Sequence, residues 1–136
     1  MYNKFRETNP QDIRTANQWL KEWGMHEIAE ELYPPTGIIM QDESTGEGIY
    51  TGFVWKTESK LFPVGFITRN PNYKKTDKNE QTTETFIRQL LLYARDLGCS
   101  HIVTWTENQS LVKCFKEKFG FTEASNRTSE LIAKII

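Results

Sequence analysis

The chain has 136 residues, of which 38% are hydrophobic, 12% aromatic and 26% charged. This length predicts a single domain, residues 1–136, burying roughly two-thirds of its unfolded surface, and the composition excludes a disordered chain. Seventeen basic against 18 acidic residues give a net charge of −1, which argues against a binder of duplex nucleic acid.

Membrane and metal partners are not expected either. No apolar run approaches the length of a membrane span, and the first residues contain no hydrophobic signal region. We therefore predict a soluble, cytoplasmic protein that is a monomer or a homodimer. Cys99 and Cys114 are predicted to be reduced thiols, and no His, Cys and acidic residues have the spacing of metal ligands.

The first third of the chain predicts one strand and two helices. Tyr2–Glu7 is a short candidate strand, and Asn9 followed by Pro10 is typical of a helix start. The expected buried stripe of this helix is Ile13, Ala16, Leu20 and Trp23. A second amphipathic helix is predicted over Met25–Tyr33, before two prolines. Its expected inward residues are Ile28, Ala29 and Leu32.

Three strands come next. Gly37–Asp42 and Ile49–Thr57 are predicted to form an antiparallel hairpin, and Pro63–Thr68 extends it into a meander.

A crossover leads on from this meander. Apolar residues at helical spacing predict a helix of about five turns that ends at Gly98. These residues are Phe86, Ile87, Leu90, Leu91, Ala94 and Leu97. His101–Thr106 is predicted to be a buried strand, and Asn108 begins another helix that ends before Gly120. This order indicates a right-handed crossover between parallel strands.

The tail, Ser129–Ile136, is predicted to be a last strand that pairs with the segment 121–124 or with His101–Thr106.

The long helix of the crossover begins where a strand ends, so its free N–H groups and positive dipole end can attract an anion. A dinucleotide or a coenzyme with a pyrophosphate is the first ligand class to consider. The alternative is that the helix is simply capped by its own Asp or Asn.

In this order and with these lengths, the chain resembles the GNAT family of acetyl-coenzyme A-dependent N-acyltransferases over nearly its whole length. The local features that carry the resemblance are the segments 5–12, Pro63–Lys74 and Asn108–Phe121. The last is similar to the family pattern Asn-x-x-Ala-x-x-x-Tyr-x-x-x-Gly-Phe. The resemblance implies a single α+β domain (α/β/α-like) with a mixed central sheet, β-αα-βββ-α-β-α-β-β, and a splayed parallel strand pair.

The resemblance also implies the cofactor and its contacts. Acetyl-CoA would be the co-substrate, with its pantetheine arm on the backbone of Ile67, Thr68 and Arg69 and near Asn108. Its pyrophosphate would rest on the loop before the long helix, which agrees with the anion site inferred from the helix start.

The chain departs from the family's phosphate loop, which has Arg or Gln, then two residues, Gly, one residue, and Gly or Ala. Counting back from Gly98 places Lys78, Gln81 and Thr83 at those positions, whereas counting forward from Pro71 makes Tyr73 and Lys74 the family's Tyr-Arg pair. No glycine occurs between Gly65 and Gly98. The side chains expected to meet phosphate are Lys74, Lys78, Gln81, Thr82 and Thr83. The alternative is a solvated lysine loop in which Asp77 and Glu80 form a capping box.

Two further positions bear on catalysis. Phe115, which the resemblance places among the cofactor-binding residues, stands where the family commonly has the tyrosine that protonates the leaving thiolate, and phenylalanine cannot do so. Glu107 is the preferred base for the acceptor amine, with Asp42 or Glu43 as alternatives. Glu107 has a structural alternative too, which is to help cap the helix that starts at Asn108.

The sequence thus predicts an N-acyltransferase that moves an acetyl group from acetyl-CoA to an amine of a small molecule, peptide or protein. The alternative is a GNAT-like binding or regulatory module with weak or no catalysis.

Overall fold

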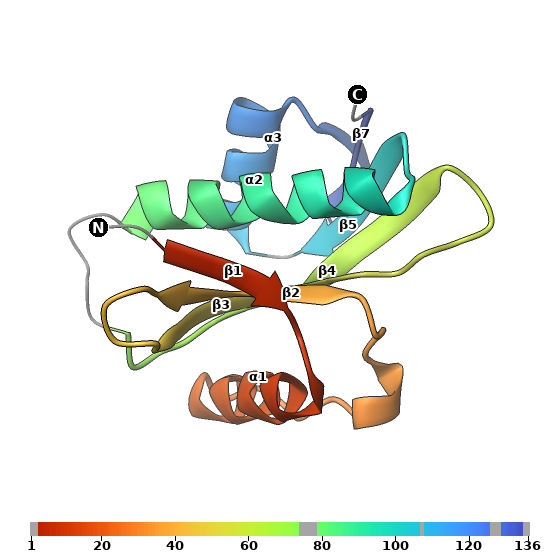
Figure 1. Ribbon diagram of the computed structural model, residues 1–136. Coiled ribbons are helices and arrows are strands. Elements are labelled where there is room, and N and C mark those ends of the chain that lie inside the picture. Colours follow the sequence, from red (N-terminus) through yellow and green to blue (C-terminus); the bar gives the residue numbers. More distant parts are fainter. Residues whose placement is uncertain (1–2, 74–78, 107, 126–128, 135–136) are drawn as a thin grey trace. The chain divides into compact units, whose positions relative to one another are not determined.

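The computed structural model describes residues 3–73, 79–106, 108–125 and 129–134. Within them the chain forms strands and helices in the order shown in Figure 1. Their bounds are β1 (Asn3–Glu7), α1 (Pro10–Glu22), the 3-10 turn η1 (Glu30–Leu32), β2 (Gly37–Asp42), β3 (Gly48–Val54), β4 (Leu61–Arg69), α2 (Asn79–Leu97), β5 (His101–Thr106), α3 (Gln109–Phe119), β6 (Thr122–Ser125) and β7 (Ser129–Lys134). The strand order is β1-β2-β3-β4-β5-β7-β6, a mixed sheet in an α+β fold, as predicted.

The chain groups into two compact units. The N-terminal unit comprises Met1–Phe53 and Phe66–Glu80, and the C-terminal unit comprises Val54–Gly65 and Gln81–Ile136. Strand β4 contributes its first five residues to the C-terminal unit and its last four to the N-terminal unit. One domain over residues 1–136 stays a prediction.

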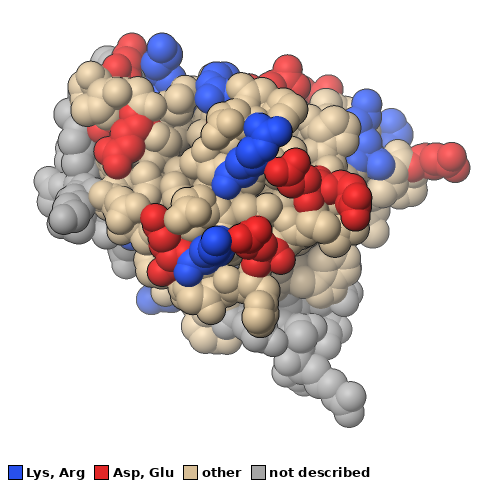
Figure 2. Space-filling model, turned by 90° about the horizontal axis from the view of Figure 1, so that it is seen from below, with Lys and Arg blue, Asp and Glu red and all other residues tan. Residues whose placement is uncertain are grey.

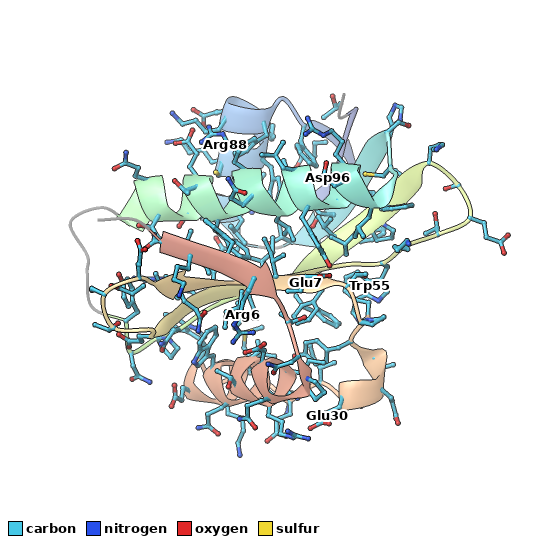
Figure 3. The ribbon with its side chains drawn as sticks, in the orientation of Figure 1. Arg6, Glu7, Glu30, Trp55, Arg88 and Asp96 are labelled. Carbon is cyan, nitrogen blue, oxygen red and sulfur yellow. The ribbon has the colours of Figure 1, made fainter. Side chains whose placement is uncertain are left out.

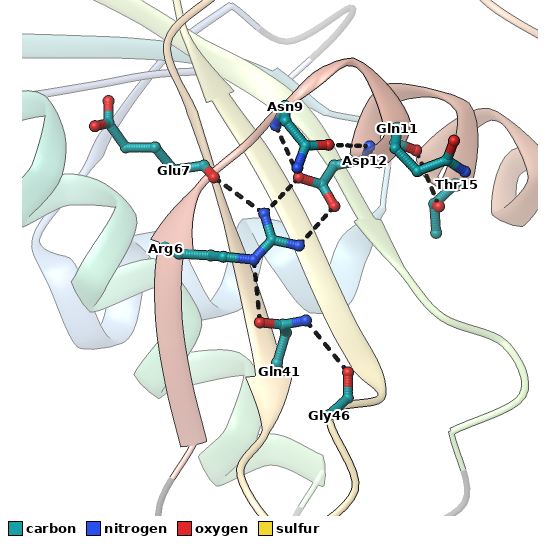
Figure 4. Close-up of polar contacts among 8 residues, drawn as sticks. All are labelled: Arg6, Glu7, Asn9, Gln11, Asp12, Thr15, Gln41 and Gly46. Carbon is teal, nitrogen blue, oxygen red and sulfur yellow. Dashed lines mark hydrogen bonds and ion pairs between the residues drawn. The ribbon is translucent and has the colours of Figure 1, made fainter.

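In the N-terminal unit, β2 pairs antiparallel with β1 on one side and with β3 on the other. Helix α1 begins at a capping box, in which the Asp12 N–H donates to Asn9 Oδ1 (3.1 Å) and the Asn9 N–H donates to Asp12 Oδ2 (2.8 Å). Arg6 on β1 donates to both oxygens of Asp12, at 2.7 and 3.0 Å (Figure 4). The start of α1 is therefore fixed both by its own cap and by the first strand.

The second predicted helix is wrong. Residues 25–29 have no regular structure, and only the short η1 turn follows. The Asn17 side chain clamps Ile28 instead, because Asn17 Nδ2 donates to the Ile28 carbonyl (2.8 Å) and the Ile28 N–H donates to Asn17 Oδ1 (3.1 Å). A helix would need these same backbone groups. Accordingly Ala29 and Leu32, predicted to point inward, are exposed.

In the C-terminal unit, β4 and β5 form the predicted parallel pair, with Leu61, Phe62 and Pro63 opposite residues 101–103. Strand β7 pairs antiparallel with both β5 and β6, so both predicted partners of the tail are confirmed. The core of this unit lies between the strands and the two helices. It contains Phe62, Val64, Phe86, Ile87, Leu90, Ala94, Ile102, Val112, Phe115 and Phe121.

The predicted ends of α2 and α3 are confirmed at Gly98 and Gly120, both with positive φ. The two helices also meet through side chains, because the guanidinium of Arg88 on α2 (labelled in Figure 3) lies 5.6 Å from the centre of the Phe119 ring of α3. Strand β3 is shorter than predicted and stops at Val54, because the Thr57 hydroxyl organises a turn by donating to the Leu61 carbonyl (2.9 Å).

Within the described residues, no helix combines the length and the apolar character needed to cross a bilayer. On the face shown in Figure 2, acidic and basic side chains alternate, and neither sign gathers into a single patch.

Candidate functional site

Strand β4 contains a β-bulge. Trp55 N–H donates to the Pro63 carbonyl (2.9 Å), and Asn70 N–H donates to the Ile49 carbonyl (2.8 Å). The two bonds are six residues apart on the β3 side, from Ile49 to Trp55. They are seven residues apart on the β4 side, from Pro63 to Asn70. One extra residue on one strand of an antiparallel pair is a β-bulge, which bends the strand and changes the direction of its edge.

Phe66 lies within this bulge and has a φ of 51°, the one positive value among the described non-glycine residues. This conformation costs an L-residue roughly 1–2 kcal/mol. The Phe66 ring packs edge-on against Tyr33 at a centroid distance of 5.0 Å, so packing within the N-terminal unit offsets the strain.

The hydrogen bond from Asn70 also fixes the direction of the β4 backbone beyond the bulge. In a trans peptide the carbonyl points opposite to the following N–H, so the Arg69 carbonyl points away from β3. Backbone groups alternate along an extended strand, so those of Ile67 also face away from β3 and those of Thr68 face β3. The backbone of Ile67 and Arg69 is therefore directed to the edge of β4 that faces away from β3, which we call its outer edge. Pairing with β5 at this edge involves Leu61, Phe62 and Pro63.

Thr68 is almost completely buried, and its hydroxyl donates to the Phe66 carbonyl at 3.2 Å. Of the three predicted pantetheine contacts, Ile67 and Arg69 thus present backbone groups to the outer edge, whereas Thr68 supports the bulge.

The segment after β4 is held by a turn that the sequence analysis did not predict. Tyr73 N–H donates to the Asn70 carbonyl (3.2 Å), and the buried Asn70 side chain donates to the Gly48 carbonyl (2.8 Å). The Tyr73 hydroxyl donates to Asp42 Oδ2 at 2.8 Å. Burial, aided by the Asp42 carboxylate, raises the pKa of Tyr73 to about 12. The Asn-Pro sequence at 70–71 is the signal that would have indicated the turn.

This contact bears on Asp42, which was an alternative base in the sequence analysis. Asp42 is fully buried, and Asp42 Oδ1 also accepts hydrogen bonds from the Ser44 N–H (2.9 Å) and hydroxyl (2.6 Å). A carboxylate with both oxygens engaged is suited to holding the hairpin together. Glu43 beside it is exposed.

Some of the predicted phosphate contacts belong to the described residues and others do not. Lys74, Lys78 and the alternative cap Asp77 fall outside the described residues, as does Glu107. Helix α2 starts at Asn79, so its first turns carry an exposed Gln81 and partly exposed residues 82 and 83. These three positions lie at the positive end of the α2 dipole, where an anion is stabilised.

In the C-terminal unit the two remaining predicted residues have different environments. Asn108 is the exposed N-cap of α3, with Asn108 Oδ1 accepting the Leu111 N–H at 3.1 Å. Phe115 has no exposed surface and packs on Phe121 at 4.8 Å between ring centres. The position of the family's tyrosine is thus filled by a core residue. No cluster of three possible metal ligands exists in the part of the chain that the structure describes.

No protein-family model and no curated protein matches the sequence, but solved structures match the fold. Rv2747 from Mycobacterium tuberculosis, solved in complex with CoA, has a TM-score of 0.76 at 14% identity, over 98% of this chain and 99% of that one. A GNAT superfamily phosphinothricin acetyltransferase from Sinorhizobium meliloti, in complex with acetyl-CoA, gives 0.72 at 12% identity over 99% and 89%.

The ribosomal-protein-S18-alanine N-acetyltransferase from Escherichia coli gives a TM-score of 0.72 at 12% identity, over 96% of this chain and 91% of that one. These matches span almost the full length of each chain. They show that this chain has the fold of the GNAT N-acetyltransferases.

Proposed function

We propose that this protein is an N-acyltransferase that uses acetyl-CoA to acetylate an amine. The observation that carries the proposal is the bulge at Phe66, which directs backbone groups of Ile67 and Arg69 to the outer edge of β4, where the Arg69 carbonyl accepts the indole N–H of Trp23. Such an edge can pair with an extended chain of amides, and the pantetheine arm of CoA is one. The similar structures that contain CoA or acetyl-CoA support this choice of ligand.

The start of α2 fits the charged end of the same ligand. Gln81 and the two threonines that follow it bring polar side chains to a helix N-terminus, where N–H groups and the dipole favour phosphate. Lys74 and Lys78 supply positive charge nearby in the sequence. Because no glycine lets the backbone approach the phosphates closely, we expect these side chains to make the contacts.

The bound thioester supplies an activated acetyl group. The acceptor nitrogen forms a bond to the acetyl carbon, the bond from carbon to sulfur breaks, and Glu107 takes the proton that the nitrogen loses. The leaving sulfur must be protonated by water or depart as thiolate, since Phe115 carries no acidic proton. Loss of a general acid costs on the order of a hundredfold in rate, so we expect slow turnover.

The fully buried Phe115 favours a second function, a binding module that holds acetyl-CoA without efficient transfer. Restoring the hydroxyl tests the two functions against each other. Phe115→Tyr should raise turnover if the protein is an enzyme with an impaired acid, with Phe121→Tyr as the matched control in the same cluster.

A thermal-shift titration with acetyl-CoA tests binding directly. Ligand at a hundredfold excess over its dissociation constant should add about 2.7 kcal/mol to the free energy of unfolding. Lys74→Ala with Lys78→Ala should weaken the shift, whereas Lys56→Ala, on a different loop, should not. No shift at millimolar acetyl-CoA would exclude both functions. Product formation over a panel of amines, compared for Glu107→Gln, then tests the base.

A further inference from the structure

The outer edge of β4 is already occupied at its end. The indole Nε1 of Trp23 donates to the Arg69 carbonyl at 2.7 Å, although the two residues are 46 positions apart. The Asn70 hydrogen bond to β3 directs this carbonyl away from β3, so the indole N–H is bound to an oxygen with which a donor of an extended ligand would pair. Of the edge-facing carbonyls beyond the bulge, Ile67 and Arg69, one is therefore engaged by a side chain.

The end of α1 places Trp23 there. Met25 N–H donates to the Leu20 carbonyl and Gly24 N–H donates to the Lys21 carbonyl, both at 2.9 Å. With Gly24 at a φ of 79°, these bonds form a Schellman motif in which Trp23 is the C-cap. Trp23, predicted to lie in the buried stripe of α1, lies just past the end of the helix and is 50% exposed.

A second contact joins the same two segments. Asn72 Nδ2 donates to Glu22 Oε2 at 2.9 Å, so the last residue of α1 is tied to the turn after β4 independently of the indole. The indole can thus leave the carbonyl without freeing the end of the helix. Half of its surface faces solvent, which leaves space for the ring to turn away.

We propose that Trp23 is a gate on the coenzyme-binding edge, which must release the Arg69 carbonyl before an amide N–H of the ligand can pair with it. This inference rests on the proposed function, because it takes the ligand of this edge to be CoA or acetyl-CoA. In this proposal the segment after α1 helps to admit the coenzyme, and the movement is that of the Trp23 side chain away from the Arg69 carbonyl.

Calorimetric titration of CoA into the full chain and two variants tests the gate. Trp23→Phe keeps an aromatic ring but removes the donor. A neutral hydrogen bond contributes about 0.5–1.5 kcal/mol, so the dissociation constant of CoA should fall by about threefold to tenfold. Asn72→Ala removes the parallel contact without freeing the carbonyl, and its dissociation constant should stay within about twofold of the unmodified protein.

Tryptophan emission provides a second readout in the same samples. CoA should change the emission of the unmodified protein as the indole leaves its acceptor, and Trp23→Phe should abolish this change. Trp105→Phe, which removes a similarly exposed indole from the C-terminal unit, should preserve it.

The outcomes separate this inference from the proposed function. Equal CoA affinity of the unmodified protein and Trp23→Phe, or weaker binding by the variant, overturns the gate and leaves the acyltransferase proposal standing. Binding by Trp23→Phe alone would support both, and absence of binding by every form would overturn both.

Discussion

Thr51, in the middle of β3, is fully buried, and among the described side chains its hydroxyl is the one buried polar atom with no hydrogen-bond partner. A buried hydroxyl without a partner costs about 1–3 kcal/mol, and valine has nearly the same shape. We therefore expect Thr51→Val to raise the free energy of unfolding by about 1 kcal/mol in urea denaturation.

Thr68 is the matched control, because it is also buried but donates to the Phe66 carbonyl within the bulge. Thr68→Val should lower stability or leave it unchanged. A loss of stability in Thr51→Val would show that its hydroxyl has a bound partner in solution.

Arg6 and Arg14 lie in the same unit and are both paired with a carboxylate, but they differ in the burial of that partner. The side chain of Asp12, bound by Arg6, is 7% exposed, whereas that of Glu30, bound by Arg14 at 3.4 Å, is 55% exposed. Arg6→Ala leaves a buried carboxylate without its cation and should cost about 1–3 kcal/mol of unfolding free energy. Arg14→Ala should cost less than about 0.5 kcal/mol.

Chemical denaturation of both variants measures the difference. Arg6→Lys should recover only part of the loss, since an ammonium group cannot make the two parallel bonds that Arg6 makes to Asp12. Equal losses for the two alanine variants would contradict the assignment of burial as the cause.

At the scale of single elements, α3 depends on its N-cap. Asn108 Oδ1 accepts the Leu111 N–H, one of the donors that a helix start leaves unsatisfied. Asn108→Ala should lower the free energy of unfolding by about 1 kcal/mol, and Asn108→Ser, which retains an acceptor, should restore most of it. Lys113→Ala, at an exposed position within α3, is the control. An Asn108→Ala variant as stable as the unmodified protein would mean that α3 is held by packing alone.

The elements that sequence predicted correctly are those whose limits are set locally. The starts of α1 and α3 follow from capping by Asn9 and Asn108, and the ends of α2 and α3 follow from glycine at 98 and 120. The predicted helix over Met25–Tyr33 is wrong because a distant side chain, Asn17, takes the backbone groups of Ile28. Local propensity does not contain that interaction.

The bulge in β4 could not be predicted from the sequence either, for a different reason. Positive φ is usually indicated by glycine or asparagine, but here a phenylalanine adopts it. The register difference between Ile49–Trp55 and Pro63–Asn70 becomes visible only when both strands are paired. Sequence therefore predicted the strand that carries the candidate site, whereas the geometry that directs Ile67 and Arg69 outward required the structure.

At the scale of the whole chain, the order of elements was sufficient to predict the fold, because a strand meander followed by a crossover restricts the possible topologies. The tail is predicted to pair with the segment 121–124 or with His101–Thr106, and β7 pairs with both β6 and β5. Individual site residues were harder to predict from the sequence, because some of their contacts are distant along the chain. Tyr73, for example, contacts Asp42, which lies 31 positions away.

Stability of the whole molecule at high pH depends on buried tyrosines. The pKa of both Tyr33 and Tyr73 is raised to about 12, chiefly by burial. A raised pKa means that the folded state retains these protons to higher pH than the unfolded chain, where tyrosine titrates near 10. The stabilisation is therefore complete below about pH 10 and is lost as the pH rises through about 12.

Tyr73→Phe tests this dependence, because phenylalanine keeps the ring but has no proton to lose. Between pH 9 and pH 11.5, the free energy of unfolding of the variant should fall less steeply than that of the unmodified protein. The difference between the two proteins should widen toward the upper end of this range, because the unfolded chain loses the tyrosine proton that the folded protein retains. Below pH 9 the variant should be the less stable protein, because Asp42 Oδ2 loses its donor. Urea denaturation of the variant and the unmodified protein across this range measures both effects. Parallel pH profiles would show that Tyr73 is solvated in the folded protein.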